Sequence, residues 1–141
     1  MSKKPVIKKT LEMQRISIPI YRETLNIFFG PTEDAIAAAI ADKVPDEAAE
    51  CALRRKRGVN GMFRYIENEG YYVIWLPDVP KTIWQFGVLI HELEHFLYCF
   101  MDVRGIPHTS DSDEAYAYLF EFLYCEAMTI VNALTDGTEN K

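Results

Sequence analysis

Cysteine is scarce in this sequence of 141 residues, and its placement excludes the usual cysteine-based sites. Cys51, Cys99 and Cys125 form no Cys-x-x-Cys pair, so we expect neither a cysteine zinc site nor a disulfide framework. Cys99 and Cys125 fall inside apolar runs that are typical of helices. These features favour reduced, buried thiols in a cytoplasmic protein.

Long uninterrupted apolar runs are also absent. The basic residues within 2–9 are not followed by an apolar stretch, so no signal peptide is predicted. Residues 115–134 approach the length of a membrane span, but Glu121 and Glu126 lie inside them. We expect this segment to be a buried core helix and the protein to have no membrane partner.

Basic side chains are few in the second half of the chain. Residues 1–70 carry 12 basic and 10 acidic side chains, a net +2, whereas residues 71–141 carry 3 and 11, a net −8. Such an acidic half favours a bound cation and disfavours nucleic acid as a partner. The four consecutive cations at 54–57 could grip phosphate, but we expect them to form an exposed loop.

The rest of the pattern predicts a single α+β domain over residues 13–135, with flexible tails at 1–12 and 136–141, because no repeat or low-complexity linker divides the chain. Apolar periodicity, turn residues and helix caps predict the order of its elements. They are a strand over 16–29 bulged near Pro19, a helix over 34–41, a short helix over 46–53, hairpin strands over 62–66 and 71–76, a helix over 80–101, and a helix from about 110 to 134.

Residues 91–95, His-Glu-Leu-Glu-His, carry the clearest chemistry in the sequence. Residues four apart lie on one face of a helix, so His91 and His95 can aim their imidazoles at one ion. Zn²⁺ accepts histidine nitrogen at about 2.0–2.1 Å, and a catalytic zinc has three protein ligands and one open position. Glu92 stands beside the pair, where a carboxylate can take a proton from water.

A third ligand is expected at the start of the following helix. Asp113 and Glu114 occupy that helix N-terminus, where the helix dipole favours the ionised carboxylate that a metal needs. Ala115 and Ala117 are small and would let Glu114 approach closely. The alternative is that both acids only complement the helix dipole.

His-Glu-x-x-His, followed by glutamate after 18 intervening residues, resembles the gluzincin metallopeptidases, above all their minimal single-domain members, the minigluzincins. The resemblance implies that His91, His95 and Glu114 bind zinc and that Glu92 is the general base of a peptidase. It also implies a small zincin-like fold in which a strand, a helix and a hairpin precede the motif helix and the glutamate helix.

In that family the strand just before the motif helix borders the cleft and pairs with an extended substrate. The resemblance therefore assigns substrate binding to residues 71–76, and to Tyr72, Ile74 and Trp75 in particular.

The sequence departs from the family in two respects. Larger gluzincins often place an acid four residues after the third ligand, and Tyr118 stands there instead. The transition-state donor is left open between Tyr98, His108 and Tyr116. The metzincin pattern is excluded, because Tyr98 and Met101 replace its glycine and its third histidine.

The expected function is a zinc-dependent peptidase that hydrolyses a peptide or protein substrate. Residues 114–119 also resemble the glutamate helix of small bacterial and phage metallopeptidase-like proteins that inactivate repressors, which favours a phage origin. The alternative is a non-catalytic zinc-binding adaptor or phage regulatory protein with a relic site, in which His108 or Asp113 closes the metal centre as a fourth ligand. A weaker alternative uses residues 54–57 to bind nucleic acid. The oligomeric state is left open.

Overall fold

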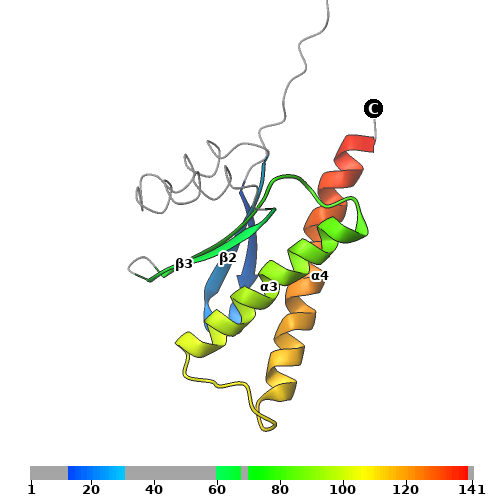
Figure 1. Cartoon of the computed structure of the whole chain (residues 1–141). Coiled ribbons are helices and arrows are strands. Elements are labelled where there is room, and N and C mark those ends of the chain that lie inside the picture. The colour runs from blue at the N-terminus through cyan, green and yellow to red at the C-terminus, as the bar shows by residue number, and fades with distance from the viewer. Residues whose placement is uncertain (1–12, 31–59, 68–69, 140–141) are drawn as a thin grey trace, which may run out of the picture.

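The computed structural model describes residues 13–30, 60–67 and 70–139 (Figure 1). The helices predicted over 34–41 and 46–53 lie outside the described residues, as do the basic residues 54–57 and the tail predicted at 1–12.

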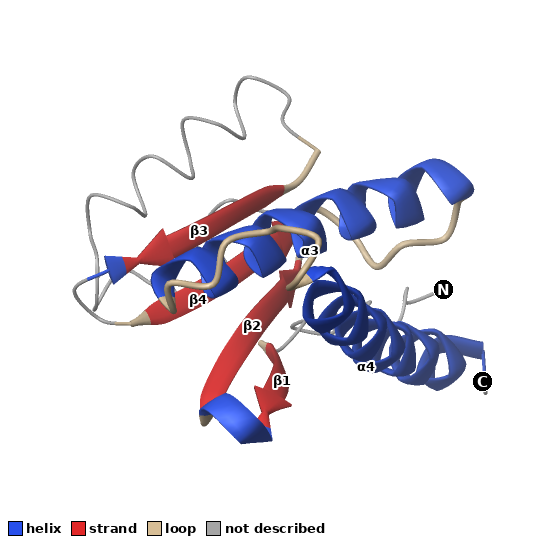
Figure 2. Cartoon of the chain, turned by 90° about the horizontal axis from the view of Figure 1, so that it is seen from below, coloured by secondary structure: helices blue, strands red, loops and turns tan. Residues whose placement is uncertain are grey.

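The described chain forms one four-stranded mixed sheet and two long helices, which confirms the predicted α+β class (Figures 1 and 2). The strand order is β1-β2-β4-β3, with β2 and β4 parallel and the other two pairs antiparallel. The elements are β1 (Gln14–Ile18), the 3₁₀ turn η1 (Pro19–Tyr21), β2 (Glu23–Phe29), β3 (Met62–Ile66), β4 (Tyr71–Leu76), α3 (Ile83–Val103) and α4 (Asp113–Glu139).

The single strand predicted over 16–29 is two antiparallel strands, so that prediction is wrong in topology. Pro19 opens the turn η1 rather than a bulge, because its fixed φ suits the first turn of a helix. Arg22 then adopts a left-handed conformation with φ of 53° and its N–H donates to the Pro19 carbonyl. This reversal pairs Ile16 with Leu25.

The predicted β3–β4 hairpin is confirmed, and Gly70 in its turn has φ of +57°. β2 and β4 lie inside the sheet, and side chains on both of their faces are buried, as with Ile74 and Trp75 on neighbouring positions of β4. Such double burial is typical of parallel strands. Among the described residues, α3 and α4 pack on one face only, that of Leu25 and Ile74.

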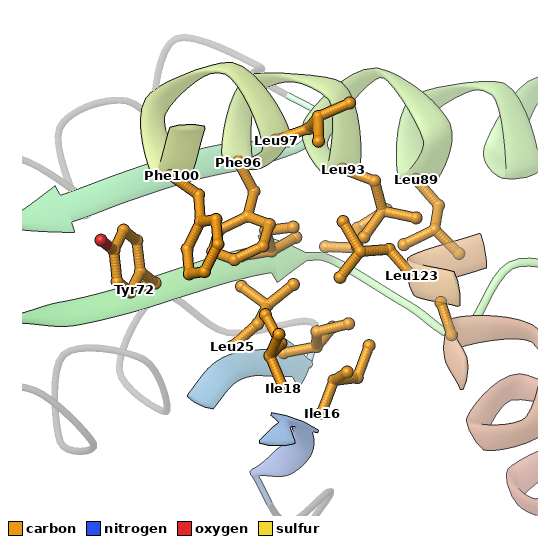
Figure 3. Close-up of a cluster of buried hydrophobic side chains, with 14 of the residues drawn as sticks. Ile16, Ile18, Leu25, Tyr72, Leu89, Leu93, Phe96, Leu97, Phe100 and Leu123 are labelled. Atoms are coloured by element: carbon orange, nitrogen blue, oxygen red, sulfur yellow. The ribbon is translucent and has the colours of Figure 1, made fainter. Parts of the chain in front are cut away.

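α3 is seated on the sheet by apolar residues spaced three and four apart (Figure 3). They are Leu89, Leu93, Phe96 and Phe100, each at most 1% exposed. The helix begins at Ile83 rather than at Pro80, because Thr82 caps it. The Thr82 side chain accepts from the Gln85 N–H, and the Gln85 side chain accepts from the Thr82 N–H.

α4 packs on α3 and β1 through one face, and it runs to Glu139, beyond the predicted end near residue 134. The buried residues of that face are Tyr116, Leu123, Ala127 and Val131. Only 17% of the most apolar 18-residue stretch of α4 is buried, so the expectation of a buried core helix is confirmed for one face alone. By length and composition alone α4 could span a membrane, but core helices of soluble domains can have the same length and composition.

Arg104 ties the end of α3 to the β1–β2 connection. Its guanidinium donates to the Phe100 carbonyl at 3.1 Å, forms an ion pair with Glu23 at 3.3 Å, and stands 3.5 Å over the Phe100 ring. The Tyr72 hydroxyl lies 3.5 Å from the same group and the Tyr21 ring 5.1 Å away. One side chain therefore holds helix, sheet and turn together.

We expect Arg104→Ala to lower the free energy of unfolding by about 1–3 kcal/mol, because one half-buried group loses its hydrogen bonds and its ring contacts together. Urea unfolding followed by circular dichroism measures the change. Lys81→Ala, at an exposed position, is the control and should change stability by less than about 0.5 kcal/mol. Equal effects of the two substitutions would contradict the role of Arg104.

Candidate metal centre

His91 and His95 converge on the exposed side of α3. Their Nε2 atoms are 3.0 Å apart, and the rings stand edge to face with centroids 4.6 Å apart. Two nitrogens that share a tetrahedral zinc ion lie about 3.3 Å apart, given Zn–N bonds of about 2.0–2.1 Å. The two imidazoles therefore fit a common ion, and without one the same separation lets one ring N–H donate to the other ring.

Glu92 is buried on the side of α3 that faces the start of β3. It is 7% exposed, whereas its neighbour His91 is exposed. A Cβ atom built on Gly61 would stand 3.4 Å from Oε1 of Glu92 and 2.6 Å from a methyl of Val88. Glycine at this position thus lets the chain entering β3 approach α3 beside the carboxylate.

Glu114 does not join the histidines. Its side chain is exposed in the first turn of α4, and among the described residues no three His, Cys, Asp or Glu side chains come close enough to hold a metal ion. Asp113 pairs with His108 instead, with Oδ1 3.0 Å from Nε2. Glu114 as third ligand stays a prediction, and so does closure of the site by His108 or Asp113.

Tyr98, His108 and Tyr116, the three candidates for the transition-state donor, differ in burial and in their hydrogen bonds. Tyr116 is buried and its hydroxyl donates to the Ile106 carbonyl at 2.6 Å. Desolvation raises the pKa of Tyr116, with smaller contributions from Asp102 and Tyr98, so this hydroxyl keeps its proton and its partner.

Tyr98 stays a candidate for the transition-state donor, because its side chain is accessible. It is exposed one turn after His95 on α3, and its hydroxyl lies 3.4 Å from Nδ1 of His108. The contacts from Asp113 to His108 and from His108 to Tyr98 thus connect the first turn of α4 with α3. Sequence spacing does not predict these two contacts, because His108 lies in the loop between the helices.

The assignment of substrate pairing to β4 is wrong. β4 is bonded to β2 on one side and to β3 on the other, so it has no free edge. The side chains of Tyr72, Ile74 and Trp75 are at most 2% exposed, and the Trp75 indole donates to the Gly30 carbonyl at 3.2 Å. The outermost strand of the described sheet beside α3 is β3, where Phe63 packs edge-on against Phe96.

The two described cysteines are free thiols, as predicted, but neither is fully buried. Cys99 is half-buried, and burial together with the charge of Asp102 raises its pKa. Cys125 is exposed. Within the described residues Cys99 belongs to no group of three potential metal ligands.

Comparison with known proteins adds no relative: no family model, no curated protein and no solved structure matches the chain. The likeness to gluzincins therefore depends on residues 91–114.

The close approach at Gly61 leads to a stability prediction. Gly61→Ala places a methyl 2.6 Å from Val88 and should cost about 1–3 kcal/mol of unfolding free energy through overpacking. Adding Val88→Ala should restore part of it, a coupling that a double-mutant cycle by urea unfolding measures.

The matched control is Gly87→Ala on the exposed side of α3, where nothing lies within 4 Å of the added methyl. This change should stabilise the protein by up to about 1 kcal/mol, because alanine favours a helix interior over glycine. A Gly61→Ala protein as stable as wild type would show that β3 and α3 are not in close contact there.

Proposed function

We propose that this protein is a zinc-dependent peptidase in which His91 and His95 bind the metal and Glu92 is the general base. The observation that carries the proposal is the 3.0 Å convergence of the two Nε2 atoms on the helix that also carries the buried carboxylate of Glu92, the residue after His91. Buried carboxylates are costly, and they are common where a protein does proton chemistry.

The donor set fits zinc in part. Two imidazoles are in place, and Glu114 is proposed as third ligand because α4 packs against α3 and its first turn carries this carboxylate. When bound, zinc supplies Lewis-acid polarisation of a carbonyl oxygen and lowers the pKa of water to about 7.

The chain itself supplies the proton transfer and the alignment of the substrate. Glu92 takes a proton from the attacking water and returns it to the leaving amine. An extended peptide paired along β3 would pass the entry at Gly61 and so bring its scissile bond beside Glu92. Tyr98 donates its hydroxyl proton to the oxygen that gains charge, and in doing so it gives up the long 3.4 Å contact with Nδ1 of His108, which Asp113 holds through Nε2.

A non-catalytic zinc-binding adaptor is the second candidate. The observation in its favour is the exposed position of Glu114, away from the histidines in the part of the chain that the structure describes. Metal content and hydrolysis, measured separately, distinguish the two functions.

For the metal, we expect one zinc ion per chain by elemental analysis, and no zinc in His91→Ala or His95→Ala. Glu114→Ala should weaken zinc binding by at least about tenfold in a chelator competition, because a third ligand is lost. Glu121→Ala removes another exposed α4 carboxylate and should leave the affinity unchanged. If Glu114→Ala matches Glu121→Ala, Glu114 is not a ligand.

For the chemistry, we expect Glu92→Gln to retain zinc and fold while its hydrolysis of a mixed peptide library falls by about 10²–10⁴-fold, the usual contribution of a general base. Mass spectrometry of the products gives the rate, and circular dichroism checks the fold. Zinc-loaded wild type that cleaves no faster than Glu92→Gln would rule out the peptidase and favour the adaptor.

A further inference from the structure

The helical layer of the protein is strongly anionic. Residues 82–136, which include α3, the following loop and α4 as far as Asp136, contain nine carboxylates and a single guanidinium, that of Arg104. Arg104 is already engaged by Glu23 and by the Phe100 carbonyl. This layer therefore presents negative charge to anything that binds between the two helices.

A groove of about 290 Å³ lies between α3 and α4. Its floor is apolar and includes Leu97, Ala117 and Phe120, while Glu94 and Asp113 stand among its lining residues. Glu94 is exposed and forms no ion pair within the described residues, whereas Asp113 is bonded to His108. Glu94 is thus the carboxylate left to a ligand.

Neither histidine lines the groove, but the α3 residues that do line it flank them on the helix. Glu94 precedes His95 in the chain, and Tyr98, which lines the groove, follows His95 by one turn. A peptide whose backbone passes the histidines can therefore place one side chain in this groove.

An apolar floor with a carboxylate at its edge matches one kind of side chain. Lysine and arginine carry an apolar stem and a cationic head, so the stem can cover the floor while the head stays at the solvated edge. An acidic side chain would be repelled by Glu94 and Asp113. A neutral apolar side chain would supply no positive charge to pair with either carboxylate.

We propose that the α3–α4 groove binds a lysine or arginine side chain of the peptide substrate and that Glu94 determines this specificity. The inference rests on the proposed function in that the bound peptide is the one to be cleaved. The binding of the side chain can nevertheless be measured without any cleavage.

The experiment uses the full chain carrying Glu92→Gln, loaded with zinc, so that bound peptide stays intact. Two fluorescent octapeptide libraries of neutral residues differ in one position, which is lysine in one and its uncharged counterpart norleucine in the other. We expect the lysine library to bind about five- to tenfold more tightly at low salt by fluorescence anisotropy, a preference that 0.5 M NaCl reduces.

Two further substitutions test the groove itself. Adding Glu94→Gln should remove most of the lysine preference, whereas Glu126→Gln, an exposed α4 carboxylate outside the groove lining, should leave it intact. Ala117→Lys places a cation on the groove floor and should abolish the preference. Equal binding of the two libraries, or equal effects of Glu94→Gln and Glu126→Gln, would overturn the proposal.

Failure of this proposal is distinguishable from failure of the proposed function. A lysine preference that Glu94→Gln removes, in a protein whose wild type cleaves nothing, supports the groove and rejects the peptidase. Cleavage by wild type without any preference for lysine supports the peptidase and rejects the groove.

Discussion

The seating of α3 on the sheet determines where every candidate functional group points. Leu93, Phe96 and Phe100 are fully buried, and Phe96 meets the Tyr72 ring edge-on with centroids 5.2 Å apart (Figure 3). Because each residue advances the helix by about 100°, this packing fixes the rotation of α3 about its axis. Turning the helix by one residue would bury a histidine and expose a phenylalanine, so the core itself holds the histidines outward.

That rotation gives the five residues 91–95 four different surroundings. His91 and His95 face solvent, Leu93 enters the core, Glu92 is buried next to Gly61, and Glu94 lines the groove against α4. The two glutamates are two residues apart and so lie on nearly opposite flanks of the histidine pair. One carboxylate is thereby available for proton transfer and the other for charge recognition.

A feature of this structure could be predicted from the sequence when it depends on residues close together in the chain. The convergence of His91 and His95 depends on i, i+4 spacing within one helix, and the β3–β4 hairpin on a short turn, so both were predictable. The neighbours of β4 depend on strand order, which local pattern does not encode. Its interior position was indicated locally, because the apolar run of residues 71–76 has no alternation. The split at Pro19 was missed because a bulge and a tight turn share the same residues.

The third ligand is the feature that depends most on tertiary geometry. Whether Glu114 reaches the histidines depends on how the loop after α3 is bonded to the start of α4. The Tyr116 hydroxyl donates to the Ile106 carbonyl, and His108 is hydrogen-bonded to Asp113. These bonds position the first turn of α4 while leaving the Glu114 side chain exposed. The net negative charge of the helical layer also bears on metal binding. Nine carboxylates and one guanidinium attract a divalent cation as well as a basic side chain. The position of a carboxylate in the first turn of α4 is therefore determined by tertiary contacts that the spacing within residues 91–114 does not encode.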